Sequence, residues 1–231
     1  MRSWFPHLPS YQAYNHRLNR LNEVLRQLSA EIISLNIPED CSEQISLIDS
    51  MPVITCSGKR EGKVAPELTC KGRCASKSMF YYGLKLHVIG WNRKGTIPWP
   101  EAVIVSNGAE NELIIFKENC GQWNNHHFYG DKIYYNNDWF ADFQVQQNSQ
   151  MFTPVKAVKG KNRRLEQFDK AAEDIYSKLV SSIRQPIESF FNWLNVKTEI
   201  QNAHRVRSTK GLLVPIFGKI AAAFLNQVFY P

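Results

Sequence analysis

Three acidic residues have sequence neighbours that are unusual for a carboxylate on an ordinary solvent-exposed surface. Asp49 interrupts a largely apolar segment just after Leu47 and Ile48, where an unpaired buried charge would be costly. Asp131 follows an aromatic run at the expected edge of a strand, and Glu188 lies among apolar residues in an expected helix. Carboxylates that are brought together repel unless a cation neutralises them, so a shared site would hold a divalent metal ion.

Each of these carboxylates also has an ordinary explanation. Asp49 could accept hydrogen bonds from nearby backbone amides, Asp131 could be a turn residue, and Glu188 could be a solvent-exposed helix charge paired with Arg184. Because the chain has 21 acidic residues, spacing alone does not select this triple. The choice therefore depends on the elements that carry the three residues and on their order.

The elements that would position these residues alternate between strand-like and helical patterns. From Ser10, a candidate N-cap, apolar residues at every third or fourth position predict one amphipathic helix to about Leu35. Strands are expected at 45–55, 80–91, 102–106, around 128–135 and at 151–157, helices at 111–119, 137–147, 168–197 and 209–229, and a basic loop over 57–78. Strands interleaved with helices, followed by long helices, predict a mixed α/β sheet covered by helices.

The composition favours a globular protein with a polyanionic partner. The 231 residues are 43% hydrophobic, enough to bury a core, and 28 Lys and Arg against 21 Asp and Glu give a net charge of +7. Pro215 and Lys219 interrupt the most apolar stretch, so no membrane span is expected, and the N-terminus lacks the apolar core of a secretory signal. We therefore expect cytoplasmic localisation and reduced cysteines, and the five cysteines lack two clean metal-ligand pairs, which makes structural zinc a weak alternative.

Three motifs carry a family resemblance over roughly residues 10–225. The first is Ile-Asp-Ser-Met-Pro-Val at 48–53, followed by the basic loop and Tyr-Gly-Leu-Lys-Leu-His-Val at 82–88, and the second is Tyr-Gly-Asp-Lys-Ile-Tyr at 129–134. The third is Arg184, three residues, then Glu188. In order, context and spacing these motifs resemble the DDE transposases of bacterial insertion sequences. The third motif is similar to the Arg-x3-Glu core of that family's Tyr-Arg-Glu-Lys signature.

The chain departs from this signature at several positions. Asn195 stands where the family has Lys, with Lys197 two residues later, and Ser181 stands where the family has Tyr. Lys197 is the candidate to take over the phosphate contact of the missing lysine. Pro186 removes a backbone hydrogen bond, so the helix that carries Glu188 is expected to begin or bend there.

The resemblance implies a ribonuclease H-like α/β fold, with a mixed five-stranded sheet flanked by helices and with N-terminal and C-terminal helices added. In that fold the first Asp lies on the central strand, the second on a neighbouring strand, and the Glu on a flanking helix. The resemblance therefore implies that Asp49, Asp131 and Glu188 bind Mg²⁺, with Mn²⁺ as the alternative. Arg184, one helical turn before Glu188, would contact a phosphate or orient the carboxylate.

The implied activity is that of a transposase, which cuts the ends of an insertion sequence and joins them to target DNA by two-metal phosphoryl transfer. Two alternatives stay open at this point. One is a nuclease of the same fold, which cuts but does not join, and the other is a decayed DNA-binding remnant without catalysis. Double-stranded DNA, as transposon ends and target, is the implied partner, and a homodimer is an open alternative.

Basic residues on expected loops and helix ends are the candidate contacts to DNA phosphates, because backbone neutralisation needs only charge and reach. For each of them, ordinary solubilising surface is the competing explanation. The candidates are Lys59, Arg60, Lys71, Arg73, Lys77, Lys161, Arg163, Arg164, Lys197, Arg205, Arg207 and Lys210.

We divide the chain into an N-terminal helical segment, 1–40, and a DDE catalytic domain, 41–231. One amphipathic helix cannot build a helix-turn-helix, which needs two packed helices. The segment 1–40 is therefore expected to be the remnant of a longer DNA-recognition region, and the chain to be incomplete as a transposase, with inactivity through truncation as an open alternative. Its DNA binding is expected to be nearly indifferent to sequence.

Overall fold

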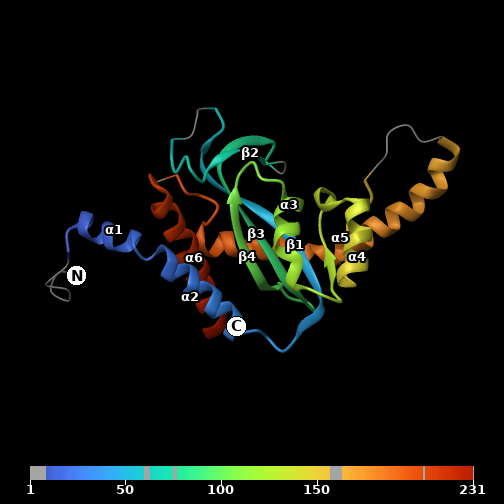
Figure 1. Ribbon diagram of the computed structural model, residues 1–231, viewed down its shortest axis with the longest axis horizontal. Helices are drawn as coiled ribbons and strands as arrows, with labels where there is room; N and C mark the ends of the chain where they lie inside the picture. The colour runs from blue at the N-terminus through green and yellow to red at the C-terminus, as the bar shows by residue number, and fades with distance from the viewer. Residues whose placement is uncertain (1–8, 60–62, 75–76, 157–162, 205, 231) are drawn as a thin grey trace.

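Six strands form one mixed sheet in the computed structural model, which describes residues 9–59, 63–74, 77–156, 163–204 and 206–230 (Figure 1). Helices lie before, between and after the strands. The strands are β1 (Cys41–Ser57), β2 (Cys70–Cys74), β3 (Met79–Arg93), β4 (Trp99–Asn107), β5 (His127–Tyr129) and β6 (Gln150–Phe152). The α-helices are α1 (Tyr11–Asn19), α2 (Asn22–Leu35), α3 (Glu112–Asn119), α4 (Asn137–Gln147), α5 (Arg163–Thr198) and α6 (Thr209–Phe229), with short 3₁₀ turns η1 (Cys120–Gln122) and η2 (Lys132–Tyr134).

The strand order confirms the predicted ribonuclease H-like fold. Five strands follow the order β4-β3-β1-β5-β6, in which β3 is antiparallel to both of its neighbours, β4 and β1, and β5 and β6 run parallel to β1. The long central strand β1 thus separates an antiparallel half of the sheet from a parallel half. The crossovers that the parallel half requires are supplied by α3 and α4.

The sixth strand, β2, was not expected from the sequence, which had suggested a basic loop. It pairs antiparallel with the first part of β3, on the edge where β4 pairs with the later part. Its residues alternate between two environments: Lys71 and Arg73 are exposed, whereas Gly72 and Cys74 are buried. The buried positions hold no large aliphatic residue, so the alternation is hidden in a sequence of Lys, Gly, Arg and Cys.

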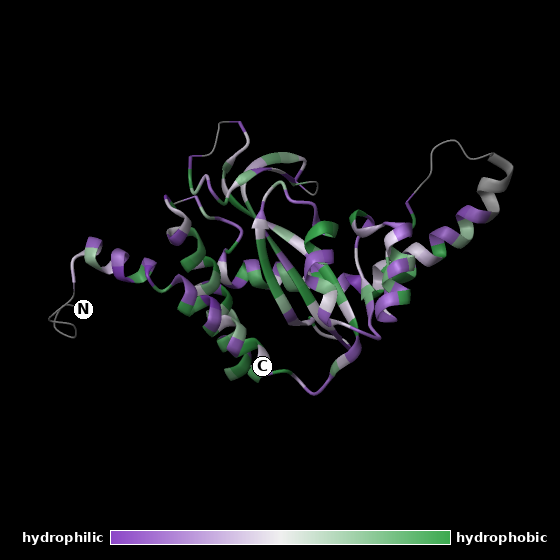
Figure 2. Cartoon of the chain, in the orientation of Figure 1, coloured by the Kyte–Doolittle hydropathy of each residue, from purple (hydrophilic) through white to green (hydrophobic). Residues whose placement is uncertain are grey.

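The two faces of the sheet are covered by different helices. One core cluster joins Leu47 and Met51 of β1 to residues of α2, α5 and α6, and the other joins Ile48 to residues of α3 and α4. Successive side chains of a strand point to opposite faces, so β1 contributes to both clusters. Figure 2 shows the central strands and much of α6 in the green of hydrophobic residues.

The expected single helix from Ser10 to Leu35 is wrong, because the structure contains two helices, α1 and α2. Ser10 caps α1 by accepting a hydrogen bond from the backbone N–H of Ala13, as its residue type suggested. At the end of α1 the backbone tightens: Arg20 and Leu21 donate to carbonyls three residues earlier instead of four. α2 then packs along α6 and buries Ile32 and Ile33, whereas no residue of α1 is buried.

Two features of the C-terminal helices differ from expectation. The helix α5 does not begin at Pro186, since it runs through the proline from residue 163 to 198 and packs Ile187, Phe190 and Leu194 against the sheet, and a bend at Pro186 stays a prediction. Among the described residues, α6 is the one helix that is long and apolar enough to cross a membrane by length and composition alone, despite the interruptions at Pro215 and Lys219. Eight residues of α6 are buried in the core, which explains its apolar composition.

Candidate active site

Asp49 lies in the middle of β1, at the centre of the sheet. Its neighbours two positions away, Leu47 and Met51, are buried in the cluster that α5 covers, so Asp49 faces the same helix. The side chain is 21% exposed, and its Oδ1 accepts a hydrogen bond from the backbone N–H of Ser50 at 2.8 Å. The sheet therefore holds a half-buried carboxylate beneath α5.

Arg184 of α5 connects Asp49 to Glu188. Its Nη1 donates to Asp49 Oδ2 at 3.1 Å, and its Nη2 donates to Glu188 Oε1, one helical turn further along. Arg184 is 13% exposed and Glu188 is 55% exposed. Ile187 and Phe190 bury the neighbouring face of the helix and thereby fix its rotation over β1. Two of the three predicted carboxylates thus share one guanidinium.

Asp131 lies just after β5, the strand that pairs in parallel with β1. It is exposed and caps η2, where its Oδ1 accepts from the backbone N–H of Lys132 at 2.6 Å. The preceding Gly130 lets the chain approach β1 closely, because a Cβ there would lie 2.8 Å from the Tyr134 ring and 2.9 Å from Ile48 Cγ1. Ile48 is the residue before Asp49, so this contact brings the chain of Asp131 to the side of Asp49.

The electrostatics of Asp49 reflect this crowding. Burial raises the pKa of Asp49 to about 7, the charges of Glu112 and Asp131 add to the increase, and Arg184 and the Ser50 N–H oppose it. Glu112 was missed by sequence reasoning. It follows the helix N-cap Asn111, where an acidic residue is ordinary, and its carboxylate pairs with Lys85 Nζ at 3.1 Å, so nothing in its sequence surroundings set it apart.

The arrangement of an Asp on the central strand, an Asp after the adjacent parallel strand and a Glu on a covering helix can be compared with known families. The family model described as "Transposase DDE domain" matches residues 40–209. The chain belongs to the DDE transposase family. Neither the curated proteins nor the solved structures include a match to it.

DDE transposases typically use divalent metal ions, and this DDE domain carries carboxylates that could bind one. Carboxylate oxygens are the ligands that magnesium prefers, and Arg184 already provides one positive charge between Asp49 and Glu188. Within the part of the chain that the structure describes, no three His, Cys, Asp or Glu side chains lie close enough together to form a metal-binding group. The donors fit the ion in their chemistry, while in this structure Asp49 and Glu188 are held by Arg184 and do not form a three-carboxylate metal-binding group with Asp131.

The predicted DNA-contacting residues of the DDE domain lie in several places. Lys59, Lys71, Arg73 and Lys77 are exposed around β2, and Arg207 and Lys210 are exposed at the start of α6. Arg163 and Arg164 lie in the first turn of α5, whereas Arg60, Lys161 and Arg205 fall outside the described residues.

Lys197 does not join the group around Arg184. It is exposed in the last turn of α5, and 197 − 188 = 9 residues separate it from Glu188. Nine residues are about two and a half helical turns, so the two side chains leave the helix on opposite sides. Lys197 therefore does not reach the position beside Glu188 where the family's lysine was expected.

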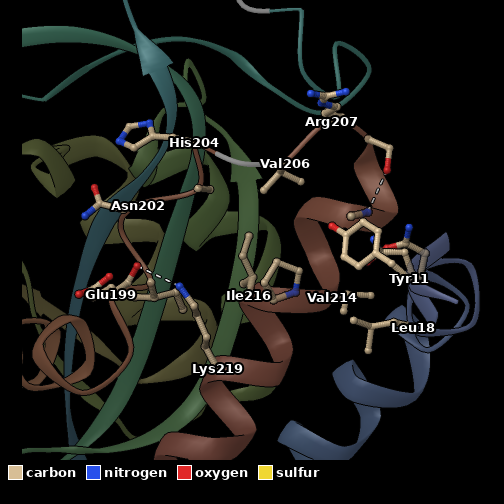
Figure 3. A pocket seen from close by; sticks show the side chains of 17 residues that line it. Tyr11, Leu18, Glu199, Asn202, His204, Val206, Arg207, Val214, Ile216 and Lys219 are labelled. Atoms are coloured by element: carbon tan, nitrogen blue, oxygen red, sulfur yellow. Dashed lines mark hydrogen bonds between the residues drawn. The ribbon is translucent and has the colours of Figure 1, made fainter. Parts of the chain in front are cut away.

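A cavity of about 1040 Å³ lies apart from the three carboxylates, between α1, the segment after α5 and the first turns of α6 (Figure 3). Tyr11 and Leu18 of α1 line one side of the cavity, and Arg207, just before α6, and Lys219 of α6 line the other side. The Lys219 ammonium donates to the backbone carbonyl of Glu199 at 3.0 Å. The cavity separates α1 from the body of the domain, in agreement with the absence of buried residues among Tyr11–Asn19.

Proposed function

We propose that this DDE domain is a transposase that cuts the ends of an insertion sequence and joins them to target DNA. Asp49, Asp131 and Glu188 are proposed as its catalytic carboxylates. The observation that carries the proposal is the bridge from Arg184 to Asp49 and Glu188, because the family motif's Arg and Glu meet the central-strand Asp in three dimensions.

The proposed metal ligands are Asp49, Asp131 and Glu188, with Mg²⁺ as the ion and Mn²⁺ as its alternative. When bound there, such an ion would stabilise negative charge on the attacking and leaving oxygens of a phosphoryl transfer. The protein's own contribution is to hold the carboxylates on rigid elements. Asp49 is fixed by β1, Glu188 is fixed by the packed part of α5, and Asp131 is fixed by its capping hydrogen bond.

Arg184 is proposed as a positioning residue that also contacts a phosphate. Its two terminal nitrogens are directed to the carboxylates of Asp49 and Glu188, while its Nε is buried and has no hydrogen-bond partner. A guanidinium has five N–H donors, so it can serve two carboxylates and still donate to a phosphate on its open side, which would orient the phosphate as well as bind it. The exposure of Glu188 and Asp131 leaves one side of this group open to a large substrate.

The expected substrate is double-stranded DNA, as transposon ends and as target. The net charge of +7 supports this assignment, and exposed cations flank β2 and the start of α6. Phosphate neutralisation by such residues supplies affinity without requiring sequence recognition.

A strand-transfer assay tests the proposal. The purified full chain is incubated with a labelled duplex carrying its element's end, a supercoiled target plasmid, and Mg²⁺ or Mn²⁺. We expect metal-dependent cleavage at the end and covalent joining of the 3′ end to the plasmid. Cleavage without joining would identify a nuclease of the same fold instead, and DNA binding without cleavage in either metal would identify a non-catalytic remnant.

A further inference from the structure

The outward face of the β2–β3 ribbon combines cations and aromatic rings. Lys71 and Arg73 of β2 pair in register with Tyr82 and Phe80 of β3. Antiparallel partners share one face of a sheet, so these four side chains, which we call the ribbon face, project on the same side. Lys71, Arg73 and Phe80 are exposed and Tyr82 is half-buried. Two cations therefore alternate with two aromatic rings on one surface.

The backbone of Phe80 is held on both sides although the residue is 56% exposed. On one side it pairs with Arg73, and on the other its carbonyl accepts a hydrogen bond from the N–H of Gly58 at 2.8 Å. The chain at Gly58 approaches so closely that a Cβ there would lie 2.6 Å from Phe80 Cβ. These contacts fix the backbone that carries the exposed ring, and the Lys71 ammonium lies 5.3 Å from the ring centroid.

All charged residues within β2 and β3 are cations. The sequence contains no Asp or Glu between Glu67 and Glu101, and Lys59 and Lys77 add two exposed cations near the same end of the sheet. An exposed aromatic ring beside cations suits a strand of nucleic acid, since phosphates bind the cations while a base stacks on the ring. In an intact duplex the faces of the bases are covered by their neighbours, so a side chain stacks on a base that is unpaired or flipped out.

We propose that the ribbon face binds an unpaired segment of DNA, with a base stacked on Phe80 and phosphates on Lys71 and Arg73. This inference rests on the proposed function, because it assigns a surface to part of the same substrate. Figure 1 shows β2 at one end of the sheet. Tyr82 pairs with Cys56, which is 56 − 49 = 7 residues along β1 from Asp49, or about 23 Å at roughly 3.3 Å per residue. The ribbon face therefore acts in binding and lies too far from Asp49 to take part in the chemistry.

The test measures binding of the full chain to matched single-stranded and duplex oligonucleotides that contain 2-aminopurine, by anisotropy and by quenching of the base analogue. Phe80→Ala is expected to weaken single-strand binding roughly tenfold and to relieve the quenching, because stacking is lost. Fully paired duplex binding is expected to change less than twofold. Phe80→Trp should restore both signals. Phe229→Ala is the matched control, since Phe229 is a 72% exposed ring at the end of α6.

Several outcomes would overturn the inference. Equal affinity of Phe80→Ala and Phe229→Ala for single strands would exclude stacking on Phe80, and an equal loss on duplex would assign the ring to duplex or protein contacts. If Phe80→Ala fails to fold, Phe80→Leu replaces it in the test. Leucine keeps an apolar residue on the strand but removes the ring, so the same loss of single-strand binding is expected. Failure of the wild-type chain to bind any DNA would reject the proposed function. If the wild-type chain cleaves DNA but Phe80→Ala binds single strands as well as the wild type does, the role of the ribbon face is rejected while the proposed function stands.

Discussion

The guanidinium of Arg184 lies 3.1 Å from the Oδ2 of Asp49, although 135 residues separate them in the sequence. The same guanidinium donates to Glu188 one turn later. Two carboxylates on different elements are therefore held beside one shared cation, which offsets their mutual repulsion. The strand, the helix and the arginine together define the position of the candidate active site.

Replacing Arg184 should affect both activity and stability. Arg184→Ala leaves the half-buried Asp49 without its cation, so we expect cleavage to fall roughly 10- to 100-fold and the free energy of unfolding to fall by about 1–2 kcal/mol. Arg184→Lys should recover little activity, because one ammonium cannot reproduce the planar guanidinium that serves both carboxylates.

Arg26→Ala is the matched control for Arg184→Ala. Arg26 pairs with Glu23 within α2, where both side chains are 54% exposed, so its removal should change stability by less than about 0.5 kcal/mol. Cleavage kinetics and urea unfolding of both variants provide the measurement. Equal behaviour of the two variants would show that the bridge at Asp49 has no special role.

The three candidate carboxylates should be needed for cleavage but not for DNA binding. Asp49→Asn, Asp131→Asn and Glu188→Gln each remove a proposed metal ligand while removing negative charge, so we expect cleavage to fall at least about a hundredfold. Affinity for DNA should stay equal or rise. Asp142→Asn, an exposed change on α4, is the control and should keep full cleavage. Near-normal cleavage by Asp131→Asn would remove Asp131 from the site.

Gly130 should be required for the position of Asp131. A Cβ at Gly130 would meet the Tyr134 ring and Ile48 at less than 3.0 Å, so Gly130→Ala must push β1 and the chain before Asp131 apart. We expect about 1–3 kcal/mol of destabilisation together with a loss of cleavage. Gly121→Ala is the control, because nothing lies within 4 Å of a Cβ there. Thermal unfolding and cleavage assays of the two variants give the comparison.

The elements with a strong periodic pattern were predicted well from the sequence. The alternation after Phe80 and the apolar run around Asp49 identified β3 and β1, and the predicted bounds of the helix at 209–229 agree with α6. These patterns arise because positions buried in the sheet or against it are occupied by apolar residues, so burial can be recognised from the residue types. The same signal placed Glu188 on a helix that covers β1.

The remaining features depend on tertiary contacts that no local pattern reports. β2 forms because β3 offers a free edge, although its own buried positions are Gly72 and Cys74. The break after α1 follows from packing of α2 along α6, while the apolar periodicity continues through it. The effect of Glu112 on Asp49 likewise arises only once α3 is placed on the sheet.

Stability should depend on pH through His87. Burial lowers the pKa of His87 to about 4, helped by the charge of Lys85, and its Nε2 lies 2.8 Å from Ser106 Oγ. Below a pH of about 6.5 the unfolded chain binds a proton at this residue that the folded chain does not. The free energy of unfolding should therefore fall as the pH is lowered from about 6.5 to about 4.

His87→Gln should reduce this loss of stability. The full effect of one such histidine is on the order of 3 kcal/mol. Burial also lowers the pKa of His126 to about 4, so part of the pH dependence should remain in His87→Gln. Urea unfolding at pH 7 and pH 4.5 measures the difference, and His16→Gln on the exposed side of α1 is the control. A pH dependence unchanged from wild type would mean that His87 is protonated in the folded protein.

DNA binding should depend steeply on salt and only weakly on sequence. Exposed cations on flexible side chains offer phosphate contacts, and each contact releases counterions from the DNA. These cations are Lys59, Lys71, Arg73, Lys77, Arg207 and Lys210. If six or more contacts form, the affinity should fall about a thousandfold or more between 50 and 200 mM salt. Titrations against the element's own terminal repeat and a scrambled duplex, at both salt concentrations, test this. A preference for the repeat above roughly a thousandfold is typical of specific binders and would show that the chain reads base sequence.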